Sequence, residues 1–399
     1  MTLRISTAGL HAQGLQGLLM RQAQVARSQQ ELVTGTKLFR AADNPSAMAE
    51  SQRLDHALST LDQHGRNAGL LEHRLRSQEQ ALADVGNQLN RARELTVQAN
   101  SPVLSVTDRK SIADELRSIR SEVLSIGNRE DGNGRRLFAG ARDGVIPFAD
   151  NGGGVSYAGD DSRNRIEVAP DLSLDDTEAG SDVFLRVRTG DGIARGVAGA
   201  GNAGSGVLQS SSVTDHAAWA GQSLSVVFTA ADTYDVVDTG GTVLASGAYS
   251  ANTTISAGGV QVTLTGAPSV GDTFTVERAP TRDVFATLQN LADSLDAPAT
   301  TPAEQARRGN ALGTALSDIG TAQDHMLTLR SSTGTRLASL DSAADARSAG
   351  EVTLSETLAE LRDVDYAEAI SKLTLQITAM EAAQKTMLRM QSLSLFDKL

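Results

Sequence analysis

Apolar residues recur at alternating spacings of three and four near both ends of this chain, and that repeat restricts its fold more than any other feature. In the first stretch the repeated positions are Leu15, Leu18, Val25 and Leu32. The spacing predicts a helix with one apolar stripe, because heptad positions lie on one face of an α-helix. Gly35 should end this helix. Such a stripe needs a covering partner, so we expect paired helices.

A helix restarts at Pro45, and the same repeat then runs without interruption from Leu71 to Ala99, so that Pro45 to Asn100 can form one helix. We therefore predict a single helix about 80 Å long, at about 1.5 Å per residue, with Asp43 or Asn44 as its N-cap. The sequence NSPVLSVTD then predicts a turn into a second helix that pairs antiparallel with the first. The expected caps of that second helix are Thr107 or Asp108.

Helices are predicted again in the C-terminal third, beginning with DVFATLQNLADSL and continuing in a long heptad segment from about Pro302. The last segment repeats the apolar spacing, and its positions are Ile370, Leu373, Ile377, Met380 and Met387, followed by Leu395. Ile370, Leu373, Ile377 and Met380 are expected to share one stripe. Leu19, Leu388 and Leu395 are expected on the far side of the terminal helices.

Between residues 143 and 280 the pattern changes to period-two segments separated by Gly, Asn and Asp. Val183, Leu185 and Val187 predict one strand, and Gly240-Gly241 lies where a tight hairpin turn is expected. A split into two small units is expected near GVAGAGNAGSG.

The predicted fold class is therefore α+β: an elongated chain whose long N- and C-terminal helices form a coiled-coil or helical bundle around a central β-rich insert. The expected divisions are a terminal helix at 1–44, bundle halves at 45–142 and 281–362, the β-rich domain at 143–280 and a terminal helix at 363–399.

Composition excludes several classes of function. The net charge is −12 with no cluster of Lys and Arg, which argues against nucleic acid or an anionic membrane as a partner. No stretch is apolar for long enough to cross a bilayer, and the N-terminus lacks a secretory signal pattern. There are no cysteines, so disulfides and thiolate metal sites are excluded.

No motif predicts a cofactor, a metal or catalysis. GAGNAG at 199–204 has the spacing of a dinucleotide loop but no following helix, so we interpret it as a flexible linker. The six histidines show no metal-binding spacing and are expected to be solvated. REDGNGRR and GDDSRNR lack the ligand positions of a calcium loop and are interpreted as turns.

The pattern alone leaves two interpretations of the terminal helices open. They can pack on one globular body, as most amphipathic helices do. They can instead pair with each other and expose apolar residues that neighbouring copies cover, which would account for the apolar ending LRMQSLSLFDKL.

Four segments carry a resemblance to a known family. LNRARELTVQANS (89–101) resembles the signature of the first long helix of the flagellin superfamily, and DVDYAEAISKLTLQITAMEAAQKTM (363–387) is similar to its C-terminal helix. DGNGRRLFAGAR (131–142) and the terminal SLSLFDKL resemble the hook-associated protein 3 family, the hook-filament junction proteins.

The resemblance implies a non-enzymatic structural protein of the bacterial flagellum that needs no cofactor. It implies export through the flagellar type III channel and a ring of identical subunits between the first junction protein and flagellin, with a secretion chaperone bound before export. The terminal helices would line the inner tube. The expected subunit and chaperone contacts are then Leu15, Leu18, Val25, Leu32, Ile370, Leu373, Ile377, Met380, Met387 and Leu395.

Two other functions remain open at this point. One is a flagellin that builds the filament itself, which would differ in the GRRLFAGAR and LFDKL motifs. The other is a surface-exposed binding protein whose β-rich insert recognises host or glycan ligands.

Overall fold

The computed structural model describes residues 7–42, 44–152 and 154–396. The chain divides into two compact units. One unit combines the two ends of the chain, up to Gly65 and from Ala344 onward, and the other contains residues 66–343.

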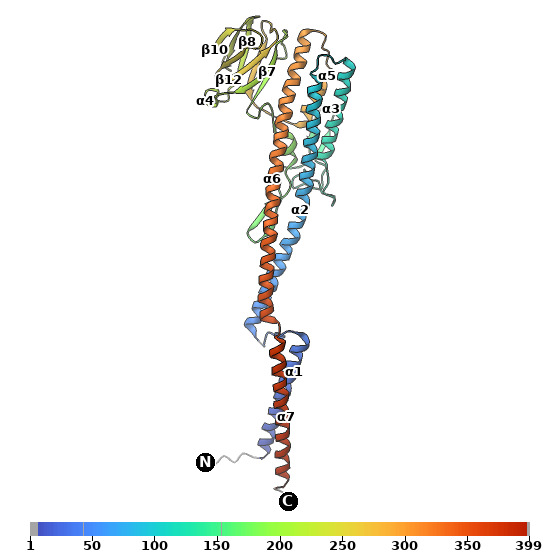
Figure 1. Cartoon of the computed structure of the whole chain (residues 1–399), viewed down its shortest axis with the longest axis vertical. Helices are drawn as coiled ribbons and strands as arrows, with labels where there is room; N and C mark the ends of the chain where they lie inside the picture. The colour runs from blue at the N-terminus through green and yellow to red at the C-terminus, as the bar shows by residue number, and fades with distance from the viewer. Residues whose placement is uncertain (1–6, 43, 153, 397–399) are drawn as a thin grey trace. The chain divides into compact units, whose positions relative to one another are not determined.

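Two terminal helices pair in the first unit. Helix α1 (Thr7–Thr34) and helix α7 (Tyr366–Phe396) run side by side (Figure 1). They are antiparallel, because the backbone just after α1 bonds to the backbone just before α7, where Val364 N donates to the Gly35 carbonyl at 3.0 Å. Gly35 ends α1 as predicted, with a φ of 71° that favours glycine.

The two long helices predicted from the heptad repeat are confirmed as α2 (Pro45–Ala99) and α6 (Pro302–Arg362). At the start of α2, the Asn44 side chain accepts a hydrogen bond from the Ala47 backbone N–H at 3.1 Å, which is the expected N-cap contact. Asp43, the alternative cap, lies outside the described residues.

Helices α3 (Val106–Gly127) and α5 (Val284–Asp296) complete the helical part of residues 66–343. Ion pairs between Arg91 and Glu115 and between Asp84 and Arg129, each at 2.7 Å, show that α3 returns antiparallel to α2. The prediction of Thr107 or Asp108 as the cap of α3 is wrong. Ser105 is the N-cap, and Asp108 is the third residue of its capping box.

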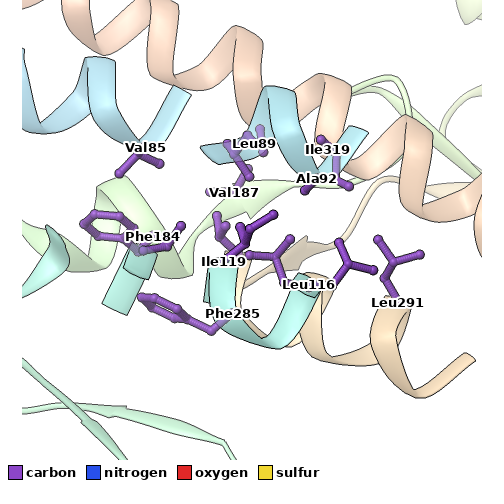
Figure 2. Close-up of a cluster of buried hydrophobic side chains, with 14 of the residues drawn as sticks. Val85, Leu89, Ala92, Leu116, Ile119, Phe184, Val187, Phe285, Leu291 and Ile319 are labelled. Carbon is purple, nitrogen blue, oxygen red and sulfur yellow. The ribbon is translucent and has the colours of Figure 1, made fainter. Parts of the chain in front are cut away.

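The main hydrophobic core is formed by α2, α3, α5 and α6 (Figure 2). Leu89 and Ile119 are buried in this core together with Phe184 and Phe285. Phe148 extends the aromatic cluster, with ring centroids 5.3 Å from Phe184 and 5.5 Å from Phe285. This core also contains residues from the segment between α3 and the sheets, so that segment packs directly on the helices.

A buried ionic group holds two loops on α2. Arg74 is 6% exposed and donates to Asp131 at 2.7 Å and to Asp176 at 2.9 Å. Asp131 lies in the REDGNGRR turn and also accepts from the Asn133 and Arg135 backbone N–H groups. The turn interpretation of this segment is confirmed, and its aspartate, Asp131, has a structural role.

Two antiparallel sheets share a second core. One has five strands in the order β10-β9-β8-β13-β6 and the other has three in the order β11-β12-β7, with Phe228, Val262 and Phe274 buried between them. The strands are β6 (Ala194–Ala198), β7 (Val207–Val213), β8 (Leu224–Ala230), β9 (Thr233–Val237), β10 (Val243–Ala248), β11 (Thr254–Ala257), β12 (Val260–Thr265) and β13 (Thr273–Arg278), with the short helix α4 (His216–Trp219).

Short two-stranded pairs make up the remaining β structure. These are β1 (Phe148–Asp150) with β2 (Val155–Tyr157), β3 (Arg165–Ala169) with β4 (Leu172–Asp175), and β5 (Val187–Arg188) with β14 (Thr281–Arg282).

Two local features of the β-rich insert, a hairpin and a strand, were predicted from the sequence. The hairpin at Gly240-Gly241 is confirmed between β9 and β10. The strand at Val183–Val187 is wrong, because Ser181–Leu185 form a π-helical turn that points Val183 and Phe184 into the helical core.

The flexible linker at 199–204 is also wrong. A Cβ on Gly204 would lie 2.4 Å from the Ser269 backbone nitrogen, and Asp272 accepts from the Ala203 backbone N–H at 2.7 Å. The expected split near this loop is therefore not found, since β6 before it and β7 after it contribute to one core. His64, expected to be solvated, is 8% exposed.

Candidate assembly interface

The first candidate surface is the face that α1 and α7 turn toward each other. Val25 on α1 and Ala369 on α7 are each 7% exposed. Of the predicted interface residues, Leu18, Leu32, Leu373, Ile377, Met380 and Met387 are partly buried, although most residues of the two helices are exposed. These residues therefore contribute to pairing within one chain.

On α7, some positions of this seam are occupied by small or polar residues, which the apolar pattern did not identify. Six buried or partly buried positions alternate by four and three, namely Ala369, Leu373, Gln376, Met380, Ala383 and Met387, and Ile377 and Ala379 beside them are also partly buried. Sequence reasoning missed Ala369, Gln376 and Ala383, because a search for large apolar side chains passes over them. An alternating spacing of three and four residues, counted in both directions from Leu373, would have found them.

Exposed apolar side chains also lie on the parts of the same two helices that are turned away from the seam. On α1, Leu15 is 50% exposed and Leu19 is 55% exposed. On α7, Ile370, Leu375 and Leu388 are 54%, 74% and 65% exposed. The expectation that Leu19 and Leu388 point away from the helix pair is confirmed. We call these five residues the outer apolar face.

Ile370 lies one heptad before Ile377 and so on the same side of α7, but it is the most exposed residue of the expected stripe, at 54%. Ile370 lies on the outer apolar face, whereas the other three are partly buried in the pair. Ile370 follows the buried Ala369 by a rotation of about 100°, which places it at the edge of the seam. Leu395 lies in α7, but its side chain is outside the described residues.

A short backbone bridge fixes how α1 and α7 meet. Lys37 N donates to the Arg362 carbonyl at 2.8 Å, next to the bond between Val364 and Gly35. A Cβ on Gly35 would lie 2.9 Å from the Tyr366 hydroxyl oxygen, so a larger residue would clash there. Asp365 then caps α7 by accepting from the Ala367 backbone N–H at 2.9 Å. This bridge sets the register of the seam.

The described residues offer this surface little chemistry beyond packing. None of the groups of His, Asp and Glu in the described ranges is suited to hold a metal ion. Over the same ranges, no helix is both long and apolar enough to cross a membrane. What the surface can do is bind other apolar helices.

Comparison with known proteins matches both ends and the whole length of the chain. The sequence model of the bacterial flagellin N-terminal helical region matches residues 5–143, and that of the flagellin C-terminal helical region matches residues 316–398. The flagellar hook-associated protein 3 of Escherichia coli K12 is 23% identical over 399 residues, which cover 99% of each chain.

Two solved structures are similar over most of the fold. The crystal structure of Xanthomonas campestris FlgL is 41% identical with a TM-score of 0.72, covering 77% of this chain and 99% of that one. The flagellar junction protein FlgL of Legionella pneumophila is 25% identical with a TM-score of 0.71, covering 79% of this chain and 100% of that one.

Proposed function

This chain belongs to the hook-associated protein 3 (FlgL) family of the flagellin superfamily, and from that premise we propose that it joins the hook of a bacterial flagellum to the flagellin filament. It is a structural protein of the flagellum, needed for motility. Its helical ends and β-rich middle are the architecture of this family.

The outer apolar face is the observation that carries the proposal. Leu15, Leu19, Ile370, Leu375 and Leu388 are each at least half exposed on a pair of helices. Apolar surface of this kind is stabilised by association, at roughly 25 cal/mol for each Å² removed from water. Copies of the same helix pair, arranged around a tube, would supply that cover.

The partners follow from this position. We propose that each subunit contacts identical subunits around the ring, the first junction protein on the hook side and flagellin on the filament side. The seam residues Val25, Leu373 and Met380 would hold the terminal helix pair in shape, while the outer apolar face makes contacts between subunits.

The proposal also covers the export of the chain and the place of each of its segments in the flagellum. The chain would leave the cell through the flagellar export channel, with a chaperone covering the C-terminal helix beforehand by a helix-in-groove contact. Segments 1–44 and 363–399 would form the inner tube, 45–142 and 281–362 the surrounding bundle, and 143–280 the outward domain.

A flagellin is the second candidate, because the two terminal sequence models are those of flagellin. The junction protein is favoured, since the similarity to the E. coli hook-associated protein extends through the β-rich middle and covers 99% of each chain. Purified protein separates the two: a flagellin grows long filaments by itself, whereas a junction protein does not.

Deletion of the gene tests the proposal in cells. We expect hooks without filaments by electron microscopy, together with flagellin released into the medium, and restoration of filaments when the wild-type gene is returned. Intact filaments on the deletion strain would contradict the proposal.

A further inference from the structure

A basic cleft lies far along the sequence from the terminal helices, within residues 66–343. It has a volume of about 340 Å³ and is bordered by β6, α5 and α6. Clefts of roughly 300 Å³ and above, at the meeting of a sheet and helices, are the size and place in which proteins bind small molecules. The charged side chains that line it are Arg195, Arg282, Arg307 and Asp318.

Asp318 is already neutralised by the protein. It is 3% exposed, and its Oδ2 accepts from Arg195 Nη2 at 3.0 Å, with Arg282 Nη1 at 3.7 Å. Its other oxygen accepts from the Gly190 backbone N–H at 2.7 Å. Three guanidinium groups against this one carboxylate leave an excess of two positive charges in the cleft, in a chain whose net charge is −12.

Two of the arginines keep donors without an acceptor. Arg195 is 7% exposed, and its Nε–H is buried with no hydrogen-bond partner among the described residues. Arg307 is exposed at the cleft and makes no ion pair or hydrogen bond with any described residue. A buried cationic N–H without an acceptor is costly, and the donors of the exposed Arg307 are open to an added anion.

The helix side of the lining is mixed, with polar side chains at Thr287, Asn290, Asn310 and Thr314 and apolar ones between them. Leu291 on α5 and Ala311 and Ala315 on α6 border the same cleft, opposite Val197 on β6. An inorganic anion would leave these side chains unused. An organic anion would place its hydrocarbon part against them and its oxygens toward the guanidinium groups.

We propose that this cleft binds a small organic dicarboxylate. A carboxylate matches the fork of N–H donors on a guanidinium group, which makes charge-assisted hydrogen bonds about twice as strong as neutral ones. Two carboxylates balance the excess of two positive charges, and a short hydrocarbon chain between them fits the apolar wall. One carboxylate pairs with Arg195 and the other with Arg307.

Calorimetric titration of the full-length protein with succinate tests this site. Sulfate is the matched probe, because it carries the same charge without a hydrocarbon part, and sodium chloride holds the ionic strength constant. We expect saturable 1:1 binding of succinate, with sulfate weaker by roughly tenfold. Arg307→Gln should weaken succinate binding by roughly tenfold or more.

Two further variants separate the site from general charge effects. Arg93→Gln removes the same charge from an exposed position on α2 and should leave succinate binding unchanged. Arg195→Gln should abolish binding, and its melting temperature shows whether the fold is kept. Absent binding, equal binding of succinate and sulfate, or equal loss in the Arg93 and Arg307 variants would each overturn the proposal.

Discussion

The terminal helix pair and the helical body of residues 66–343 share the same heptad pattern, but they bury their apolar side chains to different extents. In the body, Leu89, Leu116 and Phe285 are at most 1% exposed, because α2, α3, α5 and α6 surround them. In the terminal pair, Val25 is covered but Leu19 and Leu388 are not. Two helices have one shared seam, whereas four helices enclose a core.

Because of this difference, we expect the body to fold by itself and the terminal pair to be stabilised by assembly. The body has enough buried apolar area to fold by itself, as single domains of this size do. An isolated helix or helix pair of about thirty residues is marginal in water. The terminal pair is therefore expected to gain its stability from assembly, so the apolar surface that makes it weak as a monomer makes it useful as an interface.

Leu19→Asp should have the largest effect on assembly and almost none on folding. Leu19 is 55% exposed, so the variant should melt within about 1 °C of the wild type. In the flagellum the new carboxylate would be desolvated without a partner, at a cost of several kcal/mol in every subunit. We expect normal hooks, no filaments and no swimming.

Leu19→Met is the matched control, since it keeps an apolar side chain of similar size. It should support normal swimming. Secretion of Leu19→Asp into the medium has to be measured as well, because failed export would also remove filaments. Normal swimming of Leu19→Asp would show that the outer apolar face is not an interface, and the comparison between the two regions would fail.

Phe285→Ala tests the body, and here we expect a large effect on folding stability. Phe285 is 0% exposed and lies in the aromatic cluster, 5.7 Å from the ring of Phe184. Truncation should cost about 3–5 kcal/mol through lost burial and a cavity, which lowers the melting temperature by roughly 10 °C in a domain of this size. A melting temperature within 2 °C of the wild type, about 1 kcal/mol or less, would show that the cluster does not support the body.

The sequence predicted the long elements well and the polar contacts poorly. The bounds of α2 and α6 follow from heptad spacing, a local property that survives whatever the helix packs against. Asp318 and Asn310 occupy polar positions of α6, and nothing local distinguishes them from solvated residues. Asn310 nevertheless binds the Leu208 backbone N–H at 2.7 Å, a contact set by where β7 lies.

The seam between the two terminal helices was predicted only in part, for the same reason. Large apolar side chains located the two terminal helices, but the choice between the seam and the outer face depends on a rotation of one residue. Ile370 is exposed and its neighbour Ala369 is buried. A small side chain permits close approach of α1, and that preference appears once the partner helix is known.

Acid should weaken the body through the Arg74 group. Burial by itself raises the pKa of Asp131, but hydrogen bonds from the Asn133 backbone and from Arg74 outweigh it, so the pKa is lowered. A lowered folded pKa contributes stability above the unfolded value of about 3.9, and this stability is lost as the pH falls through the folded pKa.

Asp131→Asn should therefore lower the melting temperature at pH 7, by the equivalent of about 1–3 kcal/mol. The difference from the wild type should shrink as the pH falls from 5 to 3, because Asp131 of the unfolded wild-type chain takes up a proton there while the folded carboxylate, with its lowered pKa, stays charged. Melting curves at fixed ionic strength measure this. A difference that stays constant down to pH 3 would show that the charge of Asp131 does not stabilise the body.

The smallest expected effect compares one glycine from each region. Gly334 in α6 and Gly14 in α1 both have open space where a Cβ would lie. Alanine should stabilise either helix by about 0.5–1 kcal/mol. In Gly334→Ala this gain adds to the cooperative unfolding of the body, so the melting temperature should rise by roughly 1–3 °C. In Gly14→Ala the same gain stabilises terminal helices that are only weakly stable in the monomer. Helicity by circular dichroism should therefore rise while the temperature of the main melting transition stays unchanged.

If Gly14→Ala instead raises the main transition as much as Gly334→Ala does, the terminal pair unfolds together with the body. The two regions would then be one cooperative unit, and the exposed residues of α1 and α7 would need an explanation other than weak terminal helices awaiting assembly.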